Sequence, residues 1–210
     1  MIRRTCVIAI AVLGWASSHA AAQSGLPRAT STGELRFELG VHLSSVASSE
    51  FDEADIGIGG RFSWHPITLI GLEAEMTIYP RDFPDGRAFR RGRDEGLFGV
   101  TVGPRLGRLR PFARVRAGFM RFQEAPQPFP CIRIFPPPLR CSLASGRTAR
   151  AVDIGGGVEL FATRRTFFRI DAGDLLLRYP GPVFDSQRTP RQDGFVSHNL
   201  RLAAGGGFRF

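Results

Sequence analysis

The feature that most constrains the fold is a strict alternation of apolar and polar residues over residues 34–44, ELRFELGVHLS. The apolar set is Leu35, Phe37, Leu39, Val41 and Leu43. The intervening set is Glu34, Arg36, Glu38, Gly40 and His42. Because successive side chains of a strand point to opposite sides, a period of two predicts a strand with one apolar and one charged face.

Seven further segments repeat this alternation, which predicts eight strands in all. They are residues 55–65, 69–79, 96–103, 109–122, 149–162, 166–178 and 199–210. In four places an apolar residue falls on the polar side, namely at Phe112, Phe161, Leu175 and Leu177. We expect the strand ends to shift by a few residues there.

The predicted connections between these strands alternate in length. The long ones are residues 45–54, 80–95, 123–148 and 180–194, and the short ones are 66–68, 104–108 and 163–165. An even strand count with alternating short turns and long loops is typical of barrels that cross an outer membrane. The sequence therefore predicts an all-β, eight-stranded, antiparallel up-and-down transmembrane barrel over residues 34–210, with its short turns in the periplasm.

The charges on the polar faces indicate which face points inward. We expect ion pairs in the lumen among Arg36, Glu38, Arg61, Glu73, Glu75, Arg114, Arg116, Asp153, Glu159, Arg169, Asp171 and Arg201. With Glu34 and Arg209, the polar faces carry equal numbers of acids and arginines. An eight-stranded interior is just wide enough for side chains to fill it, and unpaired buried charges cost several kcal/mol. We therefore predict a lumen plugged by arginine–carboxylate pairs. A soluble barrel with its charges facing water remains the alternative.

The first 22 residues predict a cleaved secretory signal peptide. Arg3 and Arg4 give a positive start, residues 6–13 are apolar, and the small residues Ala20 to Ala22 suit a signal peptidase. Residues 23–33 then form a lead-in to the barrel. Cleavage after Ala20 or Ala22 would leave a net charge of +7, since the whole chain carries +9. An exported protein is a poor candidate for binding nucleic acid, whereas an acidic surface partner remains open.

The end of the chain resembles a known family. Residues 197–210, SHNLRLAAGGGFRF, resemble the last strand of small bacterial outer-membrane β-barrel domain proteins, the OmpA/OmpX-like group. Residues 152–176 are similar to the sixth and seventh strands of that group. The resemblance implies that Gly205, Phe208 and Phe210 form a signal read by the barrel-assembly machinery of the outer membrane. The group has no common activity, so the resemblance implies fold and location more than function.

The longest loop contains Cys131 and Cys141 on either side of the apolar, proline-rich sequence IRIFPPPLR. Two cysteines in one loop of an exported protein predict a disulfide. The loop is also unusually apolar for an external loop, because it contains Ile132, Ile134, Phe135 and Leu139. A contact surface and a lid over the barrel mouth are equally compatible with this composition.

Two other loops carry charges that suggest ligands. Arg87, Arg90, Arg91 and Arg93 could contact lipopolysaccharide phosphates, which guanidinium groups bind in a bidentate manner. A solvated loop is the alternative. In the first loop, Glu50, Asp52, Glu53 and Asp55 could recruit a divalent cation, although their spacing matches no calcium-loop pattern.

The sequence does not favour an enzyme or a cofactor. Ser197 and His198 are adjacent on a predicted strand, so their side chains point to opposite faces and cannot readily form a nucleophile–base pair. His42 and His65 lack a surrounding ligand set. The glycine runs at residues 155–157 and 205–207 have no following helix, so they predict close strand packing instead of a phosphate loop.

The sequence as a whole predicts a non-enzymatic, monomeric barrel in the bacterial outer membrane, without cofactor or metal. It would contact membrane lipid and lipopolysaccharide, and any surface ligand would bind its external loops. An outer-membrane enzyme acting on lipid A or peptide, and a narrow channel, are the alternatives.

Overall fold

A computed structural model describes residues 36–51, 54–80, 92–124 and 134–210. The chain divides into residues 1–34 and residues 35–210, and the described part lies in the second unit. The predicted signal peptide and lead-in therefore lie outside the described residues.

Eight long strands form one closed antiparallel barrel in the order β1-β10-β7-β6-β5-β4-β3-β2. They are β1 (Phe37–Ser48), β2 (Ala54–Trp64), β3 (Ile70–Tyr79), β4 (Arg93–Val102), β5 (Leu109–Phe122), β6 (Thr148–Phe161), β7 (Thr166–Tyr179) and β10 (Phe195–Arg209). The predicted fold class is confirmed. We call the end of the barrel with the three short turns the turn end, and the opposite end the loop end.

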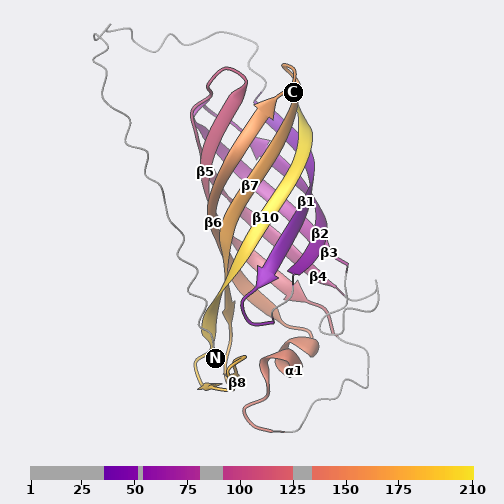
Figure 1. The fold of residues 1–210 in the computed structure, drawn as a ribbon, viewed down its shortest axis with the longest axis vertical. Helices are drawn as coiled ribbons and strands as arrows, with labels where there is room; N and C mark the ends of the chain where they lie inside the picture. Colours follow the sequence, from indigo (N-terminus) through magenta and orange to yellow (C-terminus); the bar gives the residue numbers. More distant parts are fainter. Residues whose placement is uncertain (1–35, 52–53, 81–91, 125–133) are drawn as a thin grey trace, which may run out of the picture. The chain divides into compact units, whose positions relative to one another are not determined.

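The last strand, β10, closes the barrel by pairing with the first, β1, and Figure 1 shows it lying between β1 and β7. At the turn end, the backbone of Phe37 exchanges two hydrogen bonds with Phe210, at 3.0 and 2.9 Å. Their rings stack with centroids 6.0 Å apart. Gly205 lies in this seam, where a Cβ atom would come within 2.1 Å of the Val41 carbonyl oxygen. The glycine thus permits close packing of the two strands.

The outward positions of all eight barrel strands are mainly apolar and exposed. They include Leu39, Val41, Leu43, Ile56, Ile58, Met76, Ile78, Phe98, Val100, Val115, Ile154, Val158, Phe168, Ile170, Leu200 and Leu202. The inward positions of the same strands carry most of the buried charged residues. This polarity is the reverse of the one a water-soluble barrel needs, because an aqueous protein buries its apolar faces.

The loop end of the lumen is filled by apolar side chains. Inward residues of the strands form this cluster together with two leucines of the short helix α1 (Leu139–Ala144). Its members include Val46, Tyr79, Leu97, Met120, Phe122, Leu139, Leu143, Leu175, Leu177 and Tyr179. Beside α1, the two-residue strands β8 (Val183–Phe184) and β9 (Pro190–Arg191) form a small hairpin whose Val183 joins the same cluster. The helix and this hairpin were not predicted.

This cluster corrects two expectations from the sequence. Leu175 and Leu177, like Phe112 and Phe161 near the turn end, are buried and in phase with the inward positions of their strands. The inward and outward positions keep their alternation at these residues. The interior of the barrel is apolar there, whereas its middle is charged. Because aromatic rings gather at both membrane interfaces of such barrels, the sequence also predicts an outer girdle that includes Tyr79, Phe122 and Tyr179, but all three are inside. The girdle predicted for the other end consists of Trp64, Phe168, Phe208 and Phe210, and these rings are exposed near the turn end.

No helix in the described part of the chain is long and apolar enough to cross a membrane.

Candidate functional site

The middle of the lumen holds a network of buried charges of both signs. Eight acids are buried: Glu38, Asp55, Glu73, Glu75, Glu95, Asp153, Glu159 and Asp171. Seven arginines are buried with them: Arg61, Arg93, Arg110, Arg114, Arg116, Arg169 and Arg201. An eighth, Arg209, is partly exposed and lies 2.8 Å from Glu38. When all are ionised, these charges balance.

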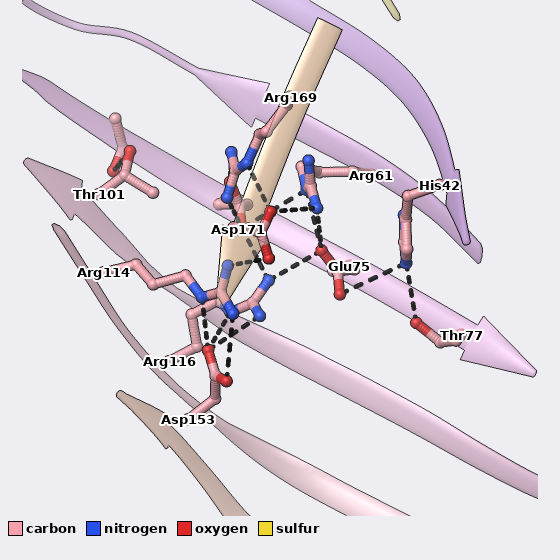
Figure 2. A network of polar contacts seen from close by, with 12 residues as sticks. His42, Arg61, Glu75, Thr77, Thr101, Arg114, Arg116, Asp153, Arg169 and Asp171 are labelled. Atoms are coloured by element: carbon pink, nitrogen blue, oxygen red, sulfur yellow. Dashed lines mark hydrogen bonds and ion pairs between the residues drawn. The ribbon is translucent and has the colours of Figure 1, made fainter. Parts of the chain in front are cut away.

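Arg116 of β5 contacts three acids of the network. Its Nη1 donates to Glu73 Oε1 and Glu75 Oε2, each at 2.8 Å. Its Nε and Nη2 donate to Asp153 Oδ2 at 3.0 and 2.9 Å. Arg116 thereby links β3 to β6 across the lumen (Figure 2). Such bonds are charge-assisted on both sides, which makes them the stronger kind of protein hydrogen bond.

The acids of this centre are each shared between several arginines. Arg61 donates to Glu75 at 2.8 Å and to Asp171 at 3.3 Å (Figure 2). Arg169 donates to Glu73 at 2.5 Å and to Asp171 at 2.9 Å. Arg114 donates to Asp153 at 2.7 Å and also pairs with Asp171. Every one of these side chains comes from an inward strand position, so the strand register fixes the network.

Residues that were not expected in the lumen, among them Asp55, Arg93, Glu95 and Arg110, extend the network in both directions. Toward the loop end, Arg201 donates to Glu95 at 3.2 Å and pairs with Glu75, and Arg93 pairs with Asp55. Toward the turn end, Arg110 contacts Glu159 at 3.3 Å and His65. These further residues could have been found by extending β4 toward residue 93 and by following the inward phase of each strand to its ends.

His42 and His65 contact this network. His42 Nε2 lies 3.0 Å from Thr77 Oγ1 and 3.5 Å from Glu75 (Figure 2). Within the described ranges, no three His, Cys, Asp or Glu side chains are placed to hold a metal ion.

Two predicted assignments are wrong. Arg36 was expected among the lumen ion pairs, but it precedes β1 and is exposed, because that strand begins at Phe37. Arg93 was expected to contact lipopolysaccharide from a loop, but it lies at an inward position of β4, buried beside Asp55 and Tyr79. Arg87, Arg90 and Arg91 lie outside the described residues.

Ser197 and His198 point to opposite faces of β10. Ser197 is buried, and its Oγ accepts a hydrogen bond from Asn199 at 3.0 Å. His198 is exposed on the outer surface, where its Nδ1 lies 2.6 Å from Asp174 Oδ2. The two residues therefore do not act on each other, as alternation along a strand requires.

The third long loop is partly buried and partly exposed where the structure describes it. Leu139 and Leu143 of α1 are buried in the cluster that fills the loop end. Ile134 and Phe135, a few residues earlier, are exposed, the latter by 80%. Cys141 lies half-buried in α1, and Cys131 lies outside the described residues. This loop thus covers the barrel mouth while presenting apolar side chains to the exterior.

The β8–β9 hairpin is held by Asp185, which accepts backbone hydrogen bonds from Gln187 at 3.0 Å and Thr189 at 2.8 Å. Its carboxylate also pairs with Arg191 at 3.0 Å. Slight desolvation opposes ionisation, but the hydrogen bonds from Thr189 and Arg191 lower the pKa of Asp185 below its ordinary value. In the first loop, Glu50 accepts a hydrogen bond from the backbone of Ser186 at 3.1 Å, which ties that loop to the hairpin.

A closed eight-stranded barrel with apolar outward faces and a charged interior is the architecture of small outer-membrane β-barrel proteins. Among solved structures, similar folds occur in the N-terminal barrel domain of Pseudomonas aeruginosa OprF and in Neisserial surface protein A. The first is 11% identical with a TM-score of 0.49, covering 82% of this chain and 97% of that one. The second is 14% identical with a TM-score of 0.47, covering 83% and 97%.

A further similar structure is the attachment invasion locus protein Ail of Yersinia pestis, 16% identical with a TM-score of 0.42, covering 83% of this chain and 97% of that chain. At these identities the likeness concerns the fold alone. No protein-family model matches the sequence. No curated protein matches it either.

Proposed function

We propose that this chain is an integral protein of the bacterial outer membrane, with a closed interior and a structural or surface-interaction role. The supporting observation is the reversed polarity of its barrel: apolar outward faces surround a lumen whose buried charges balance. Apolar faces of this extent are stable in hydrocarbon and unfavourable in water.

The interior argues against a channel. Its middle is crossed by ion pairs that join strands on opposite sides, such as Arg169 of β7 to Glu73 of β3 and Arg201 of β10 to Glu95 of β4. Its loop end is closed by apolar side chains, including the fully buried Leu175, Tyr79 and Met120. To pass through the barrel, an ion would have to displace both the ion-paired side chains in the middle of the lumen and the apolar side chains at its loop end. We therefore propose that any recognition occurs at the loop end, outside the lumen.

The exposed Ile134 and Phe135 support a contact role for the third loop, whose buried leucines hold it against the barrel. We further propose that the segment is closed by a Cys131–Cys141 disulfide, that residues 1–22 direct export, and that Gly205, Phe208 and Phe210 direct assembly.

The decisive experiment is the electrophoretic mobility of membrane extracts with and without boiling. A folded barrel should remain in the membrane fraction and change its mobility only after heating. Recovery of the protein in the soluble fraction, with no heat-dependent change, would overturn the proposal. Planar-bilayer recordings test the closed interior separately, and a steady, sizeable conductance would contradict that part alone.

A further inference from the structure

The register of the barrel places charged residues opposite one another at seven paired positions among the strands that the structure describes. Six of these pairs join opposite charges: Glu38–Arg209, Arg61–Glu75, Asp94–Arg121, Arg110–Glu159, Arg116–Asp153 and Glu159–Arg169. The seventh joins two arginines, Arg150 of β6 and Arg178 of β7. Residues directly opposite on neighbouring strands have Cβ atoms only about 4.5–5.5 Å apart, so like charges there destabilise a sheet.

Both arginines of this pair point outward and are exposed at the loop end of the barrel. They line a surface hollow of about 400 Å³ together with Thr148, Pro180, Gly181, Gln192 and Asp193. Arg178 Nη2 donates to the main-chain oxygen of Asp193 at 3.3 Å. The hollow therefore contains two guanidinium groups and one carboxylate, and its net charge is positive.

The hollow lies where exposed charged residues at the loop end meet apolar residues on the outward face of the barrel. Directly toward the turn end on the same outward faces lie Val152 and Leu176. Next come Ile154 on β6 and, opposite it on β7, Asp174, which pairs with His198. On the other side of β6, Arg121 is opposite Thr148 and also faces outward. Arg121 has Asp94 as its partner on β4, whereas the charges of Arg150 and Arg178 face each other.

From this geometry we propose that Arg150 and Arg178 form a site for a phosphate group of an outer-leaflet glycolipid, the phosphorylated headgroup of lipopolysaccharide. The inference rests on the proposed insertion, which places the loop end at the outer leaflet. A phosphate between the two guanidinium groups would turn a repulsive pair into two charge-assisted contacts. The acyl chains of the same lipid would lie against the apolar faces below.

The test uses the full chain refolded into phosphatidylcholine vesicles that contain either bisphosphorylated lipid A or the same lipid with its phosphates removed. Binding is measured by the lipid A that remains with the purified barrel. We expect the wild type to retain the phosphorylated form about tenfold more strongly, since two charge-assisted contacts are involved. Equal retention of the two lipids would overturn the proposal.

The variant for the test is Arg150→Gln with Arg178→Gln, which should lose this preference for the phosphorylated lipid. The matched control is Arg108→Gln with Arg164→Gln, which removes the same charge from exposed positions at the turn end. If the first variant keeps the full preference, or the control loses it equally, the assignment of the site is wrong. Wild-type protein without a heat-dependent mobility change would instead show that insertion itself, and the inference with it, has failed.

Discussion

Arg116 and Asp153 lie directly opposite each other on β5 and β6, and two nitrogens of the arginine share one carboxylate oxygen, at 3.0 and 2.9 Å. Both side chains are completely buried, so each compensates part of the other's charge where water cannot. Breaking such a pair is far more costly than the pair is stabilising, because the remaining charge stays buried.

The variant Asp153→Asn should therefore destabilise the barrel by roughly 3–5 kcal/mol, since Arg114 and Arg116 both lose an ionised partner. Urea unfolding of protein refolded in lipid vesicles measures this. Asp94→Asn is the matched control, because Asp94 is also paired in register with an arginine, Arg121, but faces outward. An exposed pair contributes about 0–1 kcal/mol. Similar losses in the two variants would refute a special role for the buried network.

Phe210→Asp should reduce the amount of protein inserted in the outer membrane more than it reduces stability. The backbone bonds between Phe210 and Phe37 do not depend on the side chain, whereas the exposed ring is available to the assembly machinery. Quantifying the heat-modifiable form in cells, and unfolding the refolded variant in vitro, separates the two effects. The control is Phe135→Asp, which alters an exposed ring at the loop end. Normal membrane levels of the Phe210 variant would contradict this prediction.

A charge added to the outward face should cost more in the middle of a strand than at its loop end. Leu202→Arg lies midway along β10 and should cost about 2–4 kcal/mol. Val196→Arg, on the same face near the loop end, should cost about 0–1 kcal/mol through its position in the membrane, plus the repulsion from Arg178, which is opposite it in register. Unfolding in vesicles gives both values. If the two costs are equal, the outward face does not lie in a hydrocarbon layer.

Leu175→Ala should destabilise the barrel by about 2–5 kcal/mol without creating a conducting pore. The substitution removes part of the apolar filling at the loop end, but the ion pairs in the middle of the lumen remain. Planar-bilayer recordings and unfolding of the same preparation test the two statements together. Conductance that appears only in this variant would mean that the apolar filling alone closes the lumen.

Cys131 and Cys141 should react with a maleimide reagent only after reduction. Their disulfide would stabilise the loop by somewhat less than about 3 kcal/mol, because it closes a short ring. Replacing both cysteines by serine should leave the heat-dependent mobility of the barrel unchanged, since Leu139 and Leu143 still anchor α1. Labelling of the unreduced protein would show free thiols.

The barrel could be predicted from the sequence because its determinant is local. Alternation along each segment, as in residues 34–44, requires no knowledge of distant residues. The boundaries of β5 at Leu109 and Phe122 agree with the prediction. The same argument placed Arg114, Arg116 and Asp153 on inward faces, where the structure brings them together.

What could not be predicted depends on contacts between distant segments. Leu175 and Leu177 appeared out of phase only because the whole interior was expected to be charged. They are buried in a cluster that also contains residues of α1, a helix that the proline-rich loop did not suggest. Arg93 was assigned to a loop because its partner, Asp55, is distant in the sequence and lies on a different strand, β2. The repulsive Arg150–Arg178 pair likewise exists only once the register of β6 and β7 is fixed.

The barrel closes only when β1 pairs with β10. These strands come from opposite ends of the barrel sequence, so theirs is the contact of greatest sequence separation and entropic cost. Until it forms, each exposes an unpaired edge that can template pairing with another chain. We therefore expect productive assembly to be a kinetic competition between closing this seam and aggregating. Gly205, which permits the close approach of the two strands, should affect its outcome without stabilising any single ion pair.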